Sequence, residues 1–257
     1  MIAERFPRIR VVLSRTSHPG NIGSAARAMK TMGLSTLVLV DPANFPDKMA
    51  RVMSSGAFDI LDRARVCGTL EEALEGAALA VAFTARQRDL SHEPADIRDL
   101  ACEALDVAAG QDVALVFGNE TAGLTNEEVM LCNRLAHIPA EPSYSSLNLA
   151  AAVQVVAYEF RRAALAQMQA GGDAGDASAG AIERAPMDDV ERFYEHLEAS
   201  ILRSGFLDPK QPRRLMERMR RLFGRAGLER EELNILRGML RAWDEGGKGL
   251  KGRTDGS

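Results

Sequence analysis

Three short segments of the chain carry polar side chains and glycines of the kind that can line a ligand site. Each lies next to an apolar run of strand-like composition, so each is expected where a strand ends. In chain order, the residues concerned are Asn21 and Arg27, then Gly118 and Glu120, then Ser145, Ser146 and Asn148. Taken singly, the segments are also typical of a solvated helix face, a tight turn, and a helix N-terminus capped by Ser145 or Ser146. Their chemistry depends on whether the fold brings them together.

The common phosphate, dinucleotide and metal motifs are not met. Residues 118–123 have the glycine spacing of a P-loop, but Leu124-Thr125 stands where that motif needs Lys followed by Ser or Thr. No GxGxxG opens a helix after the first strand-like run. The 4 histidines show no metal-ligand spacing, so a bound metal is not expected.

Alternating apolar runs and helical patterns predict the elements that position the polar segments. Short apolar runs predict strands at 9–13, 36–40, 65–66, 79–83, 113–117 and 135–138. Helical patterns are found at 21–32, 70–75, 94–109, 126–132 and 147–167. Repeated strand–helix–strand units indicate an α/β domain with a mainly parallel sheet over residues 1–167. Ligands of such sheets bind beyond the carboxyl ends of the strands.

The composition changes after this domain. Residues 168–182, rich in Gly, Ala, Asp and Ser, predict a flexible linker. Amphipathic patterns then predict three helices, at 187–202, 212–223 and 231–243. Residues 183–246 are therefore interpreted as a small all-α extension, and residues 247–257 as a disordered tail.

The charge of the chain is unevenly distributed. Its 257 residues include 32 Lys and Arg against 36 Asp and Glu, a formal net charge of −4. That mean excludes a basic field over the whole protein, but it hides a local excess. Residues 210–225 carry seven basic side chains and one acidic side chain, a net charge of +6. This basic stretch is the predicted place for nucleic-acid binding.

Cysteine usage and the lack of long apolar runs indicate the compartment. Cys67, Cys102 and Cys132 are too few and too scattered for a disulfide framework or a CxxC metal site. The N-terminal residues lack the apolar run of a signal peptide, and no stretch approaches the roughly 20 apolar residues of a membrane span. We expect a soluble, cytoplasmic protein with no membrane partner.

Together and in this order, the three polar segments resemble the signature motifs of the SpoU/TrmH family of RNA 2′-O-ribose methyltransferases, which belong to the knotted SPOUT class. The matching residues are Asn21–Ala28, then Leu115–Leu124, then Ile138-Pro139 with Ser146–Ala150. Two later segments, Asp188–Tyr194 and Glu232–Leu240, resemble the helical extension of the TrmJ subgroup of that family. The resemblance covers nearly the whole chain apart from the linker and the tail.

The resemblance implies a C-terminal trefoil knot in the α/β domain that forms a pocket for S-adenosylmethionine, without any metal. Carried over by motif, the pocket residues are Phe83, Thr84, Ala85, Gly118, Ile138, Ser145, Ser146 and Leu147. Relatives commonly have Thr-Ser-Ala-Arg where this chain has Phe83-Thr84-Ala85-Arg86. At this departure we expect backbone contacts, rather than the Phe83 side chain, to hold the cofactor.

The resemblance also implies a homodimer, because knotted relatives pair through this domain and share RNA across two chains. The predicted helix at 147–167 places apolar residues at helical spacing. These residues are Leu149, Val153, Val156 and Phe160. They are expected to serve either the dimer interface or the core.

Methyl transfer to a ribose hydroxyl needs a site that promotes loss of the hydroxyl proton and aligns the oxygen with the S–CH3 bond. The resemblance assigns the activating role to the arginine of the first motif, Arg27. Because a guanidinium does not readily deprotonate, we expect Arg27 chiefly to stabilise negative charge on the 2′-oxygen and to orient the adjacent phosphate. Asn21, Glu120, Ser146 and Asn148 are expected to hold Arg27 and the ribose in place.

The basic stretch, placed on a helix, gives a face suited to RNA phosphates. We expect Arg213, Arg214, Arg220 and Arg221 to bind tRNA. The alternative is a solvated helix face on which Glu217 is paired with an arginine. Tyr144, in the loop of the third motif, either stacks a base or packs locally.

The resemblance therefore predicts an S-adenosylmethionine-dependent tRNA methyltransferase that acts on the ribose of the cytidine or uridine at position 32 of the anticodon loop. Two alternatives are kept. One is a relative that acts on ribosomal RNA, which the resemblance of the C-terminal helices disfavours. The other is a catalytically silent RNA-binding module of the same fold, which is not indicated because the four polar motif residues are all present. Those residues are Arg27, Glu120, Ser146 and Asn148.

Overall fold

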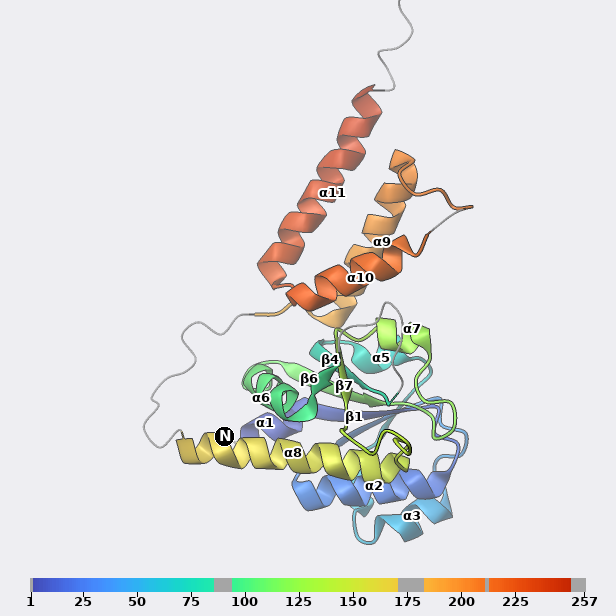
Figure 1. The fold of residues 1–257 in the computed structure, drawn as a ribbon, viewed down its shortest axis with the longest axis vertical. Coiled ribbons are helices and arrows are strands. Elements are labelled where there is room, and N and C mark those ends of the chain that lie inside the picture. The colour runs from blue at the N-terminus through green and yellow to red at the C-terminus, as the bar shows by residue number, and fades with distance from the viewer. Residues whose placement is uncertain (1, 86–93, 171–182, 211–212, 251–257) are drawn as a thin grey trace, which may run out of the picture.

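The computed structural model describes residues 2–85, 94–170, 183–210 and 213–250 (Figure 1). The first two ranges form an α/β domain and the last two form a helical extension. This combination of a parallel sheet with a small all-α extension confirms the predicted fold class. In Figure 1 the extension stands above one face of the sheet.

The described residues form a seven-stranded sheet in which all neighbouring strands run parallel. The strands are β1 (Ile9–Ser14), β2 (Thr36–Val40), β3 (Arg65–Cys67), β4 (Ala77–Phe83), β5 (Ala95–Asp96), β6 (Asp112–Phe117) and β7 (Arg134–His137). Their order across the sheet is β3-β2-β1-β6-β4-β7-β5. The strands β1, β6, β4 and β7 are therefore adjacent, and the loops after them meet at one edge.

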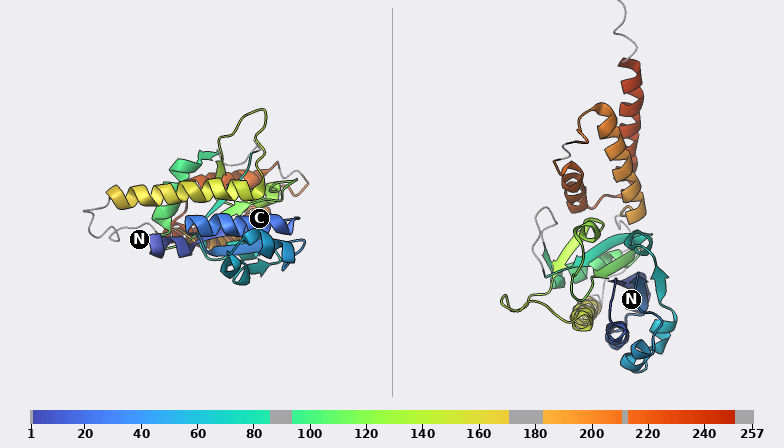
Figure 2. Two further views of the ribbon diagram at one scale, coloured as in Figure 1. Left: turned by 90° about the horizontal axis from the view of Figure 1, so that it is seen from below. Right: turned by 90° about the vertical axis from the view of Figure 1, so that its right-hand side faces the viewer.

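Helices cover both faces of the sheet. The α/β domain contains α1 (Ile2–Arg5), a 3-10 turn at Phe6–Arg8, α2 (Pro19–Met32), α3 (Lys48–Ser54), α4 (Phe58–Asp62), α5 (Leu70–Leu74), α6 (Ile97–Val107), α7 (Asn126–Met130) and α8 (Leu149–Ala170). Figure 2 shows α2 and α8 side by side across one face, and α5 and α7 lie on the face that also carries the extension (Figure 1). None of the helices in the described part of the chain is long and apolar enough to cross a membrane.

Successive residues of the central strands point into two separate cores. Val11 and Leu13 of β1 join the core under α2 and α8, whereas Val12 joins the core on the opposite face. Leu115 and Val116 of β6 divide in the same way. Because both faces of this parallel sheet are buried, its strands appear in the sequence as continuous apolar runs without polar alternation.

The start and end of α2 follow from local signals. Pro19 occupies the first turn, and His18 Nδ1 accepts a hydrogen bond from the backbone N–H of Gly20 at 3.2 Å. Gly33 ends the helix with φ 92°, a left-handed conformation that glycine adopts without steric cost. The helix therefore begins two residues before the predicted start at Asn21 and ends as predicted.

Three helices (α1, α3 and α4), the 3-10 turn at Phe6–Arg8 and the strand β5 were not predicted. The helices α3 and α4 expose the apolar side chains Met49, Val52 and Phe58, so apolar periodicity does not mark their buried faces. The strand β5 has only two residues, too few for a sequence pattern. Of these elements, α3 packs directly on α2, and Ala50 O would lie 2.0 Å from a Cβ atom at Gly23 of the first motif.

Two segment boundaries also differ from the prediction. The helix α8 continues to Ala170, inside the predicted linker, and the rest of that linker, 171–182, lies outside the described residues. The last helix reaches Leu250, four residues into the tail predicted from residue 247, and 251–257 lie outside the described part. Glycine weakens a helix by about 1 kcal/mol without ending it, which explains why the helix passes Gly246 and Gly247.

The extension, over residues 183–210 and 213–250, folds around its own core. Its helices are α9 (Met187–Ser204), α10 (Leu215–Ala226) and α11 (Arg230–Leu250). Phe193 of α9 and Phe223 of α10 meet edge to face, with ring centroids 5.1 Å apart. Met187, the first residue of α9, is buried in the α/β domain's core on the α5 and α7 face. The extension is thus docked on the domain as well as tied to it by the chain.

Candidate active site

The loops that follow β4, β6 and β7 enclose a cavity of about 280 Å³ at the carboxyl edge of the sheet. The residues expected to hold the cofactor all line it: Phe83, Thr84, Ala85, Gly118, Ile138, Ser145, Ser146 and Leu147. The rest of the wall consists of Phe117, Asn119, Glu120, Thr121, Gly123, Leu149 and Ala152. The fold thus brings residues from three distant segments to one cavity.

Phe83, where the sequence departs from its relatives, forms an apolar wall of the cavity. Its ring stacks on Phe117 with 4.7 Å between ring centroids and 9° between ring planes. The residue is only 8% exposed. The ring therefore packs on the core beneath the cavity, which leaves the following backbone at Thr84 and Ala85 on the cavity wall.

Gly118 is required by the way its loop folds back. A Cβ atom at this position would lie 2.2 Å from the backbone N of Leu124 and 2.3 Å from the carbonyl C of Gly123. No side chain can be accommodated there without moving the backbone. The tight turn predicted at Gly118-Asn119-Glu120 is therefore also part of the cavity wall.

A chain of hydrogen bonds joins the three polar segments beside the cavity. Asn21 Nδ2 donates to Glu120 Oε1 at 2.9 Å. Asn148 Nδ2 donates to Asn21 Oδ1 at 3.1 Å. The other carboxylate oxygen of Glu120 accepts from Ser17 N at 2.9 Å and from Ser17 Oγ at 2.8 Å. One residue from each motif is thus held by a residue from another.

The environment of Glu120 keeps its carboxyl group ionised at neutral pH. Burial alone raises the pKa, but the hydrogen bonds donated by Asn21 and Ser17 outweigh burial and lower the pKa of Glu120 to about 2. A carboxylate of such low pKa binds a proton poorly near neutral pH, so it is unsuited to general acid–base work. It can orient neighbouring donors and complement a nearby positive charge.

Asn148 has a second role, as the cap of α8. Its Oδ1 accepts hydrogen bonds from the backbone N–H groups of Ala150 at 3.0 Å and Ala151 at 3.4 Å. The sequence interpretation placed this cap at Ser145 or Ser146 and is corrected here. Those two serines instead line the cavity, where their hydroxyl groups can meet a ligand.

Arg27 does not join this network, although the other motif residues were expected to hold it in place. It is exposed on α2, and its guanidinium has no hydrogen-bond or ion-pair partner among the described residues. It is not part of the cavity wall either. Six residues of helix place it about 120° around the axis from Asn21, so the two side chains leave α2 in different directions.

Two residues near the cavity were given no role from the sequence. Asn119 Nδ2 donates to Arg15 O at 2.8 Å, which ties the loop after β1 to the loop after β6. Glu128, buried on α7, accepts from Arg15 Nη2 at 2.8 Å and from Thr125 N at 2.6 Å, and Ser14 Oγ also donates to it. The capping-box spacing of Thr125 and Glu128 is a sequence signal that could have marked this residue.

The four arginines expected to bind tRNA do not share one environment. Arg213 and Arg214 are exposed at the start of α10, and Arg214 lies 3.6 Å from Glu217. Arg221 is partly buried, and its Nε has no partner among the described residues. Arg213, Arg214 and Arg221 thus remain candidates for a phosphate contact.

Arg220 is a different case, and its expected role in tRNA binding is corrected. Its Nη2 donates to Glu191 Oε2 at 2.7 Å, its Nη1 donates to the other oxygen, and the guanidinium lies 4.4 Å from the Tyr194 ring centroid. Both members of the ion pair are mostly buried. Arg220 therefore holds α10 on α9 and does not offer its charge to a partner.

Comparison with known proteins places the chain in a family. The model of the SpoU rRNA methylase family matches residues 8–158, and that of the C-terminal domain of the tRNA methyltransferase TrmJ matches residues 188–252. The chain belongs to the SpoU methylase family, in its TrmJ branch. The first match spans the sheet and the cavity, and the second coincides with α9, α10 and α11.

Relatives in the TrmJ branch match over nearly their whole length. The tRNA (cytidine/uridine/adenosine-2′-O-)-methyltransferase TrmJ of Pseudomonas aeruginosa is 50% identical over 95% of this chain and 96% of its own. The tRNA (cytidine/uridine-2′-O-)-methyltransferase TrmJ of Salmonella typhimurium is 49% identical over 94% and 98%. The crystal structure of TrmJ from Z. mobilis superposes with a TM-score of 0.78 at 31% identity, covering 91% of this chain and 98% of that one.

The side chains that line the cavity limit the kind of ligand it can hold. Within the described ranges, no group of three or more His, Cys, Asp or Glu side chains could hold a metal ion. The cavity offers aromatic and aliphatic walls together with backbone and hydroxyl groups. A small organic cofactor is the kind of ligand that such a wall recognises.

Proposed function

We propose that this protein uses S-adenosylmethionine to methylate the ribose 2′-oxygen of the cytidine or uridine at position 32 of the tRNA anticodon loop. The observation that carries the proposal is the hydrogen-bond chain Glu120–Asn21–Asn148, which joins all three motif segments beside the cavity. The whole-length similarity to TrmJ enzymes supports tRNA as the substrate.

The residues around the cavity fit S-adenosylmethionine. Phe83, Ile138 and Leu147 provide apolar surface for the adenine, while Thr84, Ser145 and the backbone near Gly118 provide polar groups for the ribose and the amino acid. The ionised Glu120 on the wall complements the positive charge of a sulfonium. When bound, S-adenosylmethionine supplies the methyl group that the ribose oxygen accepts.

In this proposal the polar residues share the work of positioning and of charge stabilisation. Glu120 and Asn148 hold the side-chain amide of Asn21, so that the groups at the cavity mouth have fixed orientations. Ser146 binds the ribose. The exposed guanidinium of Arg27 stabilises the negative charge that develops on the 2′-oxygen and orients the neighbouring phosphate.

We propose that the extension binds tRNA through the basic surface of α10. Arg213 and Arg214 are exposed just before α10, and Arg218 and Arg225 are exposed on it. Within the part of the chain that the structure describes, Arg218 and Arg225 have no carboxylate partner. Arg221 adds a partly buried guanidinium. Phosphate binding by these side chains predicts an affinity that falls steeply with salt.

The proposal includes a homodimer, a trefoil knot and a cytoplasmic location. The buried side of α8, with Val153, Val156 and Phe160, serves the core. Its exposed side carries Tyr158, Leu165 and Met168, which supports a second copy packing there. The convergence of the loops after β4, β6 and β7 on one cavity supports the knot that the family resemblance implies.

Ribosomal RNA is the second candidate substrate, because the matching family is described by rRNA methylation. A direct competition separates the two. The protein is incubated with labelled S-adenosylmethionine and either unmodified tRNA or ribosomal RNA, and the 2′-O-methyl group is mapped. We expect label in tRNA at position 32. Label confined to ribosomal RNA, or to another tRNA position, would contradict the proposal.

A further inference from the structure

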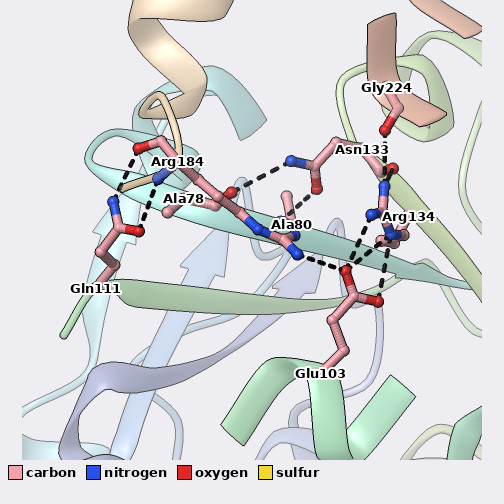
Figure 3. Close-up of polar contacts among 8 residues, drawn as sticks. All are labelled: Ala78, Ala80, Glu103, Gln111, Asn133, Arg134, Arg184 and Gly224. Carbon is pink, nitrogen blue, oxygen red and sulfur yellow. Dashed lines mark hydrogen bonds and ion pairs between the residues drawn. The ribbon is translucent and has the colours of Figure 1, made fainter. Parts of the chain in front are cut away.

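A carboxylate outside the three motifs joins the extension to the α/β domain (Figure 3). Glu103, on α6, accepts from Arg134 of β7 and from Arg184 of the segment that leads into α9. The Arg134 Nη2–Glu103 Oε1 distance is 3.0 Å, and the Arg184 Nη2–Glu103 Oε1 distance is 2.9 Å. Arg134 Nε adds a second bond to Oε1 at 3.1 Å. One carboxylate thus holds an arginine from each part of the protein.

Arg134 also reaches the end of the basic helix. Its Nη1 donates to the carbonyl oxygen of Gly224 at 2.7 Å, in the last turn of α10. Carbonyl groups in a last turn lack helical partners, and a cation there also interacts favourably with the helix dipole. The guanidinium of Arg134 therefore binds Glu103 through Nε and Nη2, and it holds α10 through Nη1.

The segment around Arg184 is held just as firmly. Gln111 Nε2 donates to Arg184 O at 2.8 Å, and Gln111 Oε1 accepts from Arg184 N at 3.0 Å. On its other side the segment pairs with the turn between α10 and α11, where Ala185 N donates to Leu228 O at 2.8 Å. This segment is thus a bridge between the α/β domain and α10.

The cluster is partly shielded from water and stays charged. The exposed fractions of the side chains are 30% for Glu103, 21% for Arg134 and 19% for Arg184. Burial raises the pKa of Glu103, but the two guanidinium groups outweigh burial and hold the pKa below its usual value. The carboxylate is therefore ionised at neutral pH, as a link between two arginines requires.

We infer that Glu103 is a positioning residue for tRNA methylation: with Arg134 and Arg184 it fixes the basic helix α10 at a set distance from the cavity. The inference rests on the proposed binding of tRNA by α10. The strand that bears Arg134 runs directly into Ile138 on the cavity wall, so the link is short and built on a rigid element. When the cavity and α10 are held at a fixed distance, one RNA binds both surfaces at once and gains affinity from the second contact. When the two surfaces are loosely joined, part of that affinity is lost.

The test compares Glu103→Gln with Asp59→Asn in the full-length protein. The carboxamide keeps the size of Glu103 but loses the charge and faces two guanidinium groups with an N–H donor. The control removes another paired carboxylate, bonded to Lys30 at 2.6 Å and remote from the extension. Initial rates are measured over a range of tRNA concentrations, together with binding of S-adenosylhomocysteine and the thermal midpoint.

For Glu103→Gln we expect KM for tRNA to rise about tenfold. The reason is that α10 is no longer fixed relative to the cavity, so binding at one surface no longer strengthens binding at the other. The kcat should stay within about twofold and S-adenosylhomocysteine should bind as before, because the cavity is unchanged. The control should match the wild type. A lower kcat or thermal midpoint at an unchanged KM would assign Glu103 to stability alone and overturn the inference.

A second variant separates this inference from the proposed function. The triple change Arg213→Ala, Arg214→Ala and Arg221→Ala removes three positive charges from the basic surface at α10 without touching Glu103. If it raises KM while Glu103→Gln does not, the positioning role is wrong and tRNA binding by α10 stands. If neither variant alters KM, tRNA binding by α10 is wrong and the inference fails with it.

Discussion

Asn21 Nδ2 donates a 2.9 Å hydrogen bond to Glu120 Oε1, and this bond ties the start of α2 to the loop that closes the cavity. The two residues are far apart in the sequence and belong to different motifs. Asn148 completes the arrangement from the third motif by donating to Asn21. The relationship explains why an amide, rather than another polar group, stands at position 21: the same side chain donates to one partner and accepts from the other.

Replacing Asn21 by Ala should therefore lower kcat for tRNA methylation by about 10- to 100-fold, since positioned groups at a reaction site contribute on this scale. S-adenosylhomocysteine binding, measured by calorimetry, should change little because Asn21 is not part of the cavity wall. Ser24→Ala on the next turn of α2 is the control. Wild-type kcat in the Asn21 variant would show that the hydrogen-bond network does not contribute to catalysis.

The low pKa of Glu120 gives a prediction for stability. In the unfolded chain the carboxyl group titrates near 4.5, and in the folded protein near 2. A depressed folded pKa means that Glu120 contributes stability above its unfolded pKa and loses that contribution as pH falls from about 4.5 towards 2. Thermal midpoints of the wild type and Glu120→Gln should differ at pH 7, and the gap should narrow below pH 4.5. A gap that stays constant over this range would contradict the assigned pKa.

Arg27 should be needed for catalysis but not for cofactor binding. Arg27→Ala and Arg27→Lys should each lower the methylation rate by roughly 10²–10³-fold, the usual cost of removing a group that stabilises developing charge. Lysine is expected to fail because it cannot present a planar fork to the ribose and phosphate together. Near-wild-type rates for either variant would show that Arg27 has no such role.

Gly118→Ala should abolish cofactor binding. Its new Cβ would meet backbone atoms of Gly123 and Leu124 within 2.3 Å, so the loop on the cavity wall must move. Gly238→Ala on α11 is the control, because nothing lies within 4 Å of a Cβ there. Binding of S-adenosylhomocysteine by calorimetry distinguishes them. Undiminished binding by the Gly118 variant would place the cofactor elsewhere.

The arginines of α10 should divide into two groups. Replacing Arg213, Arg214 and Arg221 by Ala should weaken tRNA binding and flatten its salt dependence, because fewer counterions are released. Replacing Lys48, Arg51 and Arg63, on and near α3 and α4, removes the same charge as a control. Filter binding at several salt concentrations gives both quantities. Equal slopes for the two triple variants would argue against the basic surface.

Arg220→Ala should instead destabilise the extension. Loss of the pair with Glu191 and of the contact with Tyr194 should cost roughly 1–3 kcal/mol, between the values for exposed and buried ion pairs. Urea unfolding of Arg220→Ala and of Arg225→Ala, which loses an exposed arginine of the same helix, measures the difference. Equal stability of the two variants would restore Arg220 as a candidate for tRNA binding.

The residues carried over from the family resemblance line one cavity, because they lie in loops after parallel strands whose ends meet at one edge. The sequence predicted side-chain partners poorly. The role of Arg220 depends on Glu191 and Tyr194 in another helix, which a helical pattern within α10 cannot show. The part played by Ser17 was missed because it acts partly through its backbone N–H, which every residue but proline has.

Competition among neighbouring residues explains why the cap of α8 was predicted at the wrong residue. Asn148 and the two serines before it are all good helix caps, so propensity alone could not decide among them. The structure selects Asn148, whose amide nitrogen also donates to Asn21.

The contacts of Glu103 could not be predicted for the same reason as those of Arg220. They join α6 to β7 and to the extension, which are far apart in the sequence.

Transfer of the methyl group to one ribose 2′-hydroxyl of tRNA can be measured directly. Its most direct measurement compares two transcripts, one with ribose and one with 2′-deoxyribose at position 32, as acceptors of label from S-adenosylmethionine. We expect stoichiometric labelling of the transcript with ribose and no labelling of the transcript with 2′-deoxyribose. Equal labelling of both transcripts would contradict this expectation.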